Sequence, residues 1–176
     1  VPAVIATDYK ALERMAEKKT GVPCITVATD GTKLYDKGEE EAYLRLFKKF
    51  AEEKLPTEKG TAAVIGATPL DTGFITADAL VSQIKAEGFD EVKCIGLDSG
   101  LEEIKRISRF EKIFVISPAG IRAGKYLEET FSLDVEVHGC PLPEEYTEKL
   151  KALKTSGRTL IVHQQMTANA VRDIIG

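Results

Sequence analysis

Residues 113–137 read IFVISPAGIRAGKYLEETFSLDVEV, and this stretch decides the fold. Ile113-Phe114-Val115-Ile116 is almost wholly apolar, as expected of a strand that is covered on both faces of a sheet. A helix is expected at about 120–130. Asp134–Val137 then alternates polar and apolar residues, which is typical of a half-exposed strand at a sheet edge. Two strands joined by a single helix run parallel, because the crossover returns the chain to the same end of the sheet.

The same alternation of strands and helices extends in both directions along the chain. Further strands are expected at Ala62–Ile65, Val92–Ile95 and Leu160–Val162, with helices at about 76–87, 100–108, 144–154 and 167–175. Before Gly60 the pattern predicts a short apolar strand at Ala3–Ala6, a helix at 9–19, a strand at Cys24–Val27, a loop at 30–38, a helix at 39–53 and a linker at 55–60. The sequence therefore predicts an α/β, Rossmann-like three-layer fold with a mostly parallel sheet.

The amino-acid composition argues against some classes of binding partner. The chain has 176 residues, and its formal net charge of −4 argues against nucleic acid, whose binders normally present a basic face. No apolar run approaches the roughly 18 residues that a membrane span needs, so no membrane association is expected. Three widely spaced cysteines suit a reducing, cytoplasmic compartment better than a disulfide framework. Because the chain begins at Val1 rather than Met, we expect a piece of a longer protein.

Ligands of open parallel sheets bind beyond the carboxyl ends of the strands. Six polar residues there are the best candidates for the wall of a cavity: Thr68, Asp71, Asp98, Ser99, Ser117 and Arg122. Most have a plainer interpretation as caps of the following helices. The loop at 66–73 matches neither GxGxxG nor a P-loop, so a capped turn is the favoured interpretation. Arg122 could face an anionic ligand or remain a solvated surface residue, and both interpretations stay open.

A metal site is not predicted. His138 and Cys140 are two positions apart at a strand end, but a metal site needs three or four ligands, and His163 is distant in sequence. A capping or edge histidine is the favoured interpretation. Cys24 and Cys94 are expected to be small core residues within strands.

The order of elements between Leu97 and Leu153 is more specific than any single signal. A strand at Ile113–Ser117 is followed by a small-residue turn, a helix with Leu127-Glu128-Glu129 near its end, and a Gly139-Cys140-Pro141 turn after the next strand. In this order the region resembles the second domain of the nitrogenase component 1 family. Residues 7–36 are similar to the close of that family's first domain. Residues 159–174 are similar to the start of its third domain, except that His163 stands where the family usually has glycine.

The resemblance implies three segments. Residues 1–55 would be a βαβα segment from the end of the first domain. Residues 60–156 would be the Rossmann-like middle domain, and residues 157–176 a βα segment that opens the third. The family implies a paired component 1-type subunit, electron transfer from an ATP-dependent iron–sulphur reductase, and an iron–sulphur or related metallocluster in the full-length parent.

The resemblance also limits what this chain can do alone. The family's cluster cysteines near the start of its first domain lie outside this sequence. Its catalytic subunit has a cofactor-ligating cysteine where this chain has Ile116-Ser117-Pro118, and serine is a poor ligand for iron. We therefore expect that this chain by itself binds no cofactor. We also expect it to be inactive on its own.

We therefore expect this chain to be a fragment of a nitrogenase-like oxidoreductase. Its expected function is to form part of a redox cofactor or substrate cavity. Two alternatives remain: a non-redox module that binds a small ligand, and a scaffold for cofactor assembly. Loss of the ligating cysteine fits the scaffold as well as it fits a different substrate.

Overall fold

The computed structural model describes residues 8–29, 31–73, 75–140, 142–153, 157–163 and 165–175. At its centre is a four-stranded sheet in which every neighbouring pair of strands runs parallel, in the order β2-β1-β3-β4. The strands are β1 (Glu58–Ile65), β2 (Glu91–Cys94), β3 (Phe110–Val115) and β4 (Asp134–Val137). The predicted parallel α/β architecture is confirmed, and β4 lies at the predicted edge.

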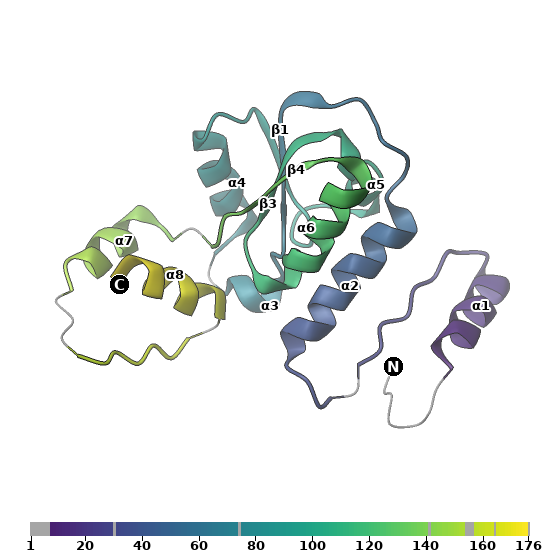
Figure 1. Cartoon of the computed structure of the whole chain (residues 1–176), viewed down its shortest axis with the longest axis horizontal. Helices are drawn as coiled ribbons and strands as arrows, with labels where there is room; N and C mark the ends of the chain where they lie inside the picture. The colour runs from purple at the N-terminus through teal and green to yellow at the C-terminus, as the bar shows by residue number, and fades with distance from the viewer. Residues whose placement is uncertain are drawn as a thin grey trace.

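Helices cover both faces of the sheet, which gives three layers (Figure 1). On one face lie α2 (Tyr35–Phe50), α6 (Pro118–Phe131) and the short α5 (Leu101–Lys105), and on the other lies α4 (Ala77–Ala86). Because successive side chains of a strand point to opposite faces, Ile65 and Val115 pack with α2 and α6, whereas Val64 and Phe114 pack with α4. The two central strands therefore carry apolar residues at successive positions, as expected from the sequence.

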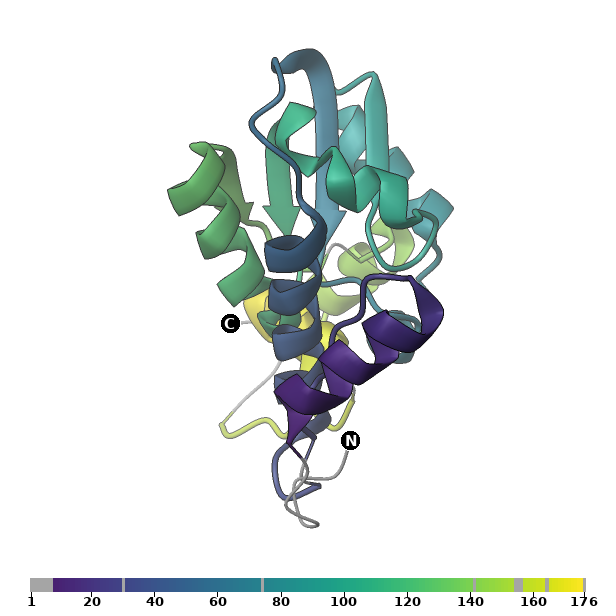
Figure 2. The same cartoon turned by 90° about the vertical axis from the view of Figure 1, so that its right-hand side faces the viewer.

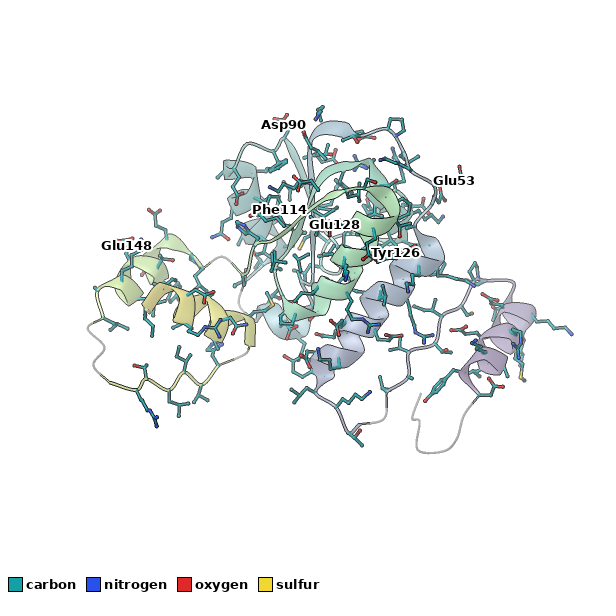
Figure 3. All side chains as sticks on the ribbon, in the orientation of Figure 1. Glu53, Asp90, Phe114, Tyr126, Glu128 and Glu148 are labelled. Atoms are coloured by element: carbon teal, nitrogen blue, oxygen red, sulfur yellow. The ribbon has the colours of Figure 1, made fainter. Side chains whose placement is uncertain are left out.

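The ring of Phe114 illustrates this packing. It lies in the middle of the sheet in Figure 3 and makes edge contacts with Phe89 and His138, at centroid distances of 5.6 and 5.2 Å. On the opposite face, Tyr126 of α6 lies under the ammonium group of Lys48 of α2, 5.5 Å from the ring centroid. The two helices on that face therefore contact each other as well as the sheet.

A close backbone approach fixes where α6 begins. Gly66, directly after β1, has φ +86°, and a Cβ added to it would lie 2.7 Å from Ser117 Oγ. A Cβ at Gly120 would lie 3.1 Å from the carbonyl oxygen of Ile65. The position of Gly66 therefore requires glycine, a Cβ at Gly120 would be tightly crowded, and the first turn of α6 lies directly against the end of β1.

The carboxyl ends of all four strands face the same side, as Figure 2 shows. The short helix α3 (Pro69–Thr72), the start of α2 and helix α8 (Gln165–Ile175) gather at this end. α3 lies inside the segment 66–73 that was expected to be a capped turn, and Thr68 caps it. The other elements are the 3-10 turn η2 (Ile107–Arg109) and α7 (Glu144–Lys151), which packs on α8.

Two predicted strands are wrong. Cys24–Val27 and Leu160–Val162 form no strand of the sheet in the described part of the chain. Leu160 and Val162 are 86% and 84% exposed. An apolar, β-branched run becomes a strand only when a neighbouring strand accepts its backbone hydrogen bonds, and the sheet described here offers none at these places. The strand expected at Ala3–Ala6 lies outside the described residues.

Helix α1 (Tyr9–Thr20), predicted correctly, stands apart from the three layers (Figure 1). None of its residues is buried. Glu17 pairs with Lys49 of α2 at 2.6 Å, and Glu13 lies 3.7 Å from Arg45. Glu13 also accepts a hydrogen bond from the backbone N–H of Thr26. Polar contacts thus attach α1 and the segment after it to the outer side of α2.

Candidate functional site

Two cavities lie near the carboxyl end of the sheet. The larger, of about 770 Å³, is formed by the segment before α2, the first two turns of α2 and Arg122 of α6. The smaller, of about 510 Å³, lies between the ends of β3 and β4 and the helix α8, and Ser117, His138 and Cys140 contribute to its wall. The candidate residues are therefore distributed over two neighbouring hollows.

The larger cavity borders a pair of carboxyl groups. Thr68 caps α3 and donates its hydroxyl hydrogen to Oε1 of Glu39 at 2.9 Å. Asp71, in α3, is only 5% exposed and accepts a hydrogen bond from the hydroxyl of Tyr35. Tyr35 and Glu39, both on α2, line the cavity itself. Thr68 and Asp71 were predicted as site residues, but Tyr35 and Glu39 were not.

The carboxyl pair changes the ionisation of the site. Burial, together with the hydrogen bond that a protonated Glu39 makes to Asp71, raises the pKa of Glu39 to about 7. The hydrogen bond to Asp71 raises the pKa of the Tyr35 hydroxyl to about 12. A cavity whose wall holds a proton at neutral pH can exchange that proton with a bound ligand or with solvent.

Arg122 is exposed, and in this structure its guanidinium is engaged by acidic side chains of α2. Its guanidinium pairs with Glu41 at 2.9 Å and lies 4.0 Å from Glu40, both on α2. Hydrogen bonds from Arg45 and then from Arg122 hold the pKa of Glu41 below its usual range. In this structure Arg122 joins α6 to α2 at the rim of the larger cavity.

Ser117 lies directly before α6, where the start of this helix packs against the end of β1. It is buried, donates its hydroxyl hydrogen to the carbonyl of Gly66 at 2.6 Å, and accepts from the N–H of Ala119. These two bonds confirm it as the N-cap of α6, with Pro118 in the first turn as predicted. The hydroxyl of Ser117 therefore already has two hydrogen-bond partners.

Asp98 and Ser99 line neither cavity. The carboxylate of Asp98 accepts from the backbone N–H of Cys94 at 2.9 Å and from the hydroxyl of Ser99 at 2.8 Å. It closes the turn after β2 rather than capping α5, whose N-cap is Gly100. Among the six predicted residues, the structure brings Arg122 to the wall of the larger cavity, Thr68 and Asp71 to its border, and Ser117 to the smaller cavity.

Two of the three cysteines are buried thiols. Burial raises the pKa of the Cys94 thiol to about 12 and that of Cys140 to about 11. Cys24 lies half-buried in the extended segment after α1, not in a strand core as predicted. Within the described ranges, no three histidine, cysteine or acidic side chains are grouped so that they could hold a metal ion. His138 instead lies 3.2 Å from both Glu87 and Glu136.

None of the helices that the structure describes combines the length and the apolar character of a membrane-spanning segment.

The family to which the chain belongs follows from comparisons with known proteins. The sequence matches the family model of the nitrogenase component 1 type oxidoreductases over residues 1–174. A comparison with curated individual proteins finds no match. The family match spans almost the whole chain and agrees with the resemblance seen in the order of its elements. The chain therefore belongs to the nitrogenase component 1 type oxidoreductase family.

Proposed function

We propose that this chain forms one wall of a redox cofactor or substrate cavity in a nitrogenase component 1-type oxidoreductase. The observation that carries the proposal is one hollow near the carboxyl ends of parallel strands, with Arg122 on its wall. Thr68 and Asp71 lie at its border, where they bond to the lining residues Glu39 and Tyr35. In this proposal residues 60–156 are the middle domain. Residues 1–55 close the preceding domain, and residues 157–176 open the next one.

The wall supplies positioning and proton chemistry. Hydroxyl groups of Tyr35 and Thr68 orient the Glu39–Asp71 pair, and the Arg122–Glu41 pair fixes the rim. Reduction of a bound small molecule consumes protons as well as electrons, and an acid that is protonated near pH 7 suits such a cavity. Any metallocluster would be held by residues outside the described ranges or by a paired subunit. Electrons would come from an ATP-dependent iron–sulphur reductase in the cytoplasm.

A second candidate is a cofactor-assembly scaffold or a non-redox binding module. It is favoured by Ser117, which stands where the related catalytic subunit has a cysteine ligand and whose hydroxyl is already hydrogen-bonded. A scaffold that passes a cofactor on, or a module that binds a small metabolite, has no need of a permanent thiolate at this place.

The decisive experiment compares the 176-residue chain with the longest natural polypeptide that contains it, both purified without oxygen. Iron analysis and the visible absorption spectrum are measured, together with oxidation of a reduced viologen dye. The proposal expects iron and electron uptake in the longer protein and neither in the 176-residue chain. A longer protein without iron and without electron uptake would favour the non-redox module.

The role of the wall is tested by substitution in the longer protein. Asp71→Asn and Arg122→Gln should lower electron uptake at least several-fold, while iron content stays unchanged. Lys125→Gln is the matched control, since Lys125 lies on the same helix as Arg122 but is 71% exposed and pairs with Glu129 of that helix. Equal activities in all three variants would remove these residues from the cavity.

A further inference from the structure

The amino-terminal end of α2 is held against α3 by four side chains: Tyr35, Glu39, Thr68 and Asp71. Two hydroxyl groups make the connections. Tyr35 donates to Oδ1 of Asp71, and Thr68 donates to Oε1 of Glu39 at 2.9 Å. Each carboxyl group therefore has one oxygen engaged by a hydroxyl donor from the opposite element. We refer to these four residues as the acid latch.

The remaining oxygen of Glu39 is the unusual feature of the latch. Oε2 of Glu39 is buried and has no hydrogen-bond donor within the described part of the chain. Asp71, its acidic neighbour, is 5% exposed. Two ionised carboxylates in such a place repel each other and lose hydration, and an unpaired buried charge is costly. When Glu39 carries a proton, its O–H can donate to Asp71, and the contact becomes attractive.

The charged groups described around Glu39 do not neutralise its carboxylate in place of this proton. On α2 itself, Asp36 and Glu40 are acidic, and Lys37 pairs with Glu40 at 3.4 Å. From α6, Arg122 reaches Glu41 and Glu40. From α8, which packs on α3, Arg172 pairs with Asp173 at 3.2 Å. Among these described groups, the cations are engaged by other acids, and Asp71 and Asp36 both oppose ionisation of Glu39.

We propose that the Glu39–Asp71 pair is a proton-operated latch, which with one shared proton holds the start of α2 against α3 and without it releases this end of the helix. The proton leaves to solvent, and no other covalent bond changes. The hydrogen bonds from Tyr35 to Asp71 and from Thr68 to Glu39 break when the helix end is released. Burial and the bond to Asp71 raise the pKa of Glu39 to about 7, so release takes place around neutral pH. Tyr35 and Glu39 also line the larger cavity, so release enlarges its opening.

A second contact limits how far the release can extend. The hydroxyl of Tyr43, further along α2, lies 2.7 Å from the carbonyl oxygen of Ile95 and 3.0 Å from that of Ala67. Tyr43 is 6% exposed, and its ring stacks near Phe47. Burial raises the pKa of this hydroxyl far above neutral, so the contact survives when the latch opens. The moving part is therefore α2 before Tyr43.

The experiment follows the latch directly in the complete 176-residue chain. Carbon-13 NMR of the glutamate side chains gives the pKa of Glu39. Hydrogen–deuterium exchange of the amides at 37–42, corrected for the intrinsic exchange rate at each pH, gives the opening constant. Between pH 5 and pH 8 this constant should rise at least about tenfold, since one proton is released and each pH unit above the open-state pKa contributes up to tenfold.

Three variants distinguish the latch from general loosening. Glu39→Gln keeps both bonds, because its amide accepts from Thr68 and donates to Asp71, so opening should become independent of pH. Asp71→Asn should return the pKa of Glu39 toward its usual range. Glu129→Gln, which removes an exposed acid on α6, should behave as the unmodified chain. A Glu39 that titrates near 4.5 overturns the proposal, and so does a Glu39→Gln chain whose opening depends on pH as strongly as that of the unmodified chain.

Discussion

The two ends of the sheet differ in how their acidic side chains are paired. At the amino end, Arg109 pairs with Glu58 of β1 and Glu91 of β2, and Lys59 pairs with Glu111. At the carboxyl end, Glu39 and Asp71 meet each other and accept from the hydroxyl groups of Thr68 and Tyr35. Every acid of the first set has a basic partner, whereas the two acids of the second set have hydroxyl donors and each other. The amino end therefore gains stability from ion pairs, whereas in our proposal the carboxyl end depends on a proton.

This difference gives the two ends opposite dependence on pH. The hydrogen bond from Arg109 lowers the pKa of Glu91 in the folded chain. Its contribution is present above the unfolded pKa and is lost as the pH falls through the folded one. The pKa of Glu39 is raised from 4.5 to about 7. Its contribution is complete below 4.5 and disappears as the pH rises through about 7.

The largest expected change in stability comes from removing the ion pairs at the amino end of the sheet. Arg109→Met keeps an apolar side chain of similar length but removes the guanidinium, which lies over the ring of Phe110 and is the shared partner of Glu58 and Glu91. Because Arg109 is only 7% exposed while both acids remain partly hydrated, we expect a loss of about 2 kcal/mol in the free energy of unfolding. Urea denaturation at pH 7 measures it. Lys59→Met, at an 84% exposed side chain, is the control and should cost under about 0.5 kcal/mol. A similar loss in both variants would contradict the comparison.

An intermediate effect of the opposite sign is expected at the carboxyl end. Glu39→Gln should stabilise the chain at pH 8 by about 1 kcal/mol, a value reduced for solvent screening of a partly exposed group. At pH 4.5 and below, the two chains should be equally stable. Thermal denaturation across this pH range gives the result. Stabilisation that persists unchanged at low pH would show that the amide acts by packing rather than by replacing a proton.

The smallest expected change in stability is at the rim of the larger cavity, where Arg122 pairs with Glu41. Arg122→Gln removes one of two cations that lower the pKa of Glu41, and Arg45, the larger cause, remains. The pKa of Glu41 should rise only part of the way to its usual range, and stability should change by less than about 0.5 kcal/mol. Side-chain NMR titration follows Glu41. A destabilisation comparable to that of Arg109→Met would mean that the rim, too, is built for stability.

The sequence predicts the sheet well because the signals for its strands are local. The apolar run at Ile113–Ile116 and the alternation at Asp134–Val137 each indicate a strand and its place in the sheet. Cys24–Val27 and Leu160–Val162 have equally suitable residues but no neighbouring strand among the residues that the structure describes, and the existence of a partner cannot be inferred from the run itself.

The site was harder to predict, for a related reason. Topology places Thr68, Asp71 and Ser117 at one end of the sheet, since parallel strands share an orientation. Nothing in the local sequence pairs Tyr35 with Asp71, which are 36 positions apart, and Glu39 is one of three successive acids in a pattern typical of a solvated helix. Only packing shows which of those three acids meets Asp71.

The unequal burial of the three cysteines makes the chain a convenient subject for spectroscopy. Cys94 and Cys140 are buried thiols that react slowly, whereas Cys24 is half-buried between α1 and α2, with its Sγ 3.2 Å from the carbonyl of Val22. A brief treatment with a maleimide dye should therefore mark Cys24 in preference to the other two. A fluorophore at this place would report how α1 moves relative to α2 without any change to the sheet.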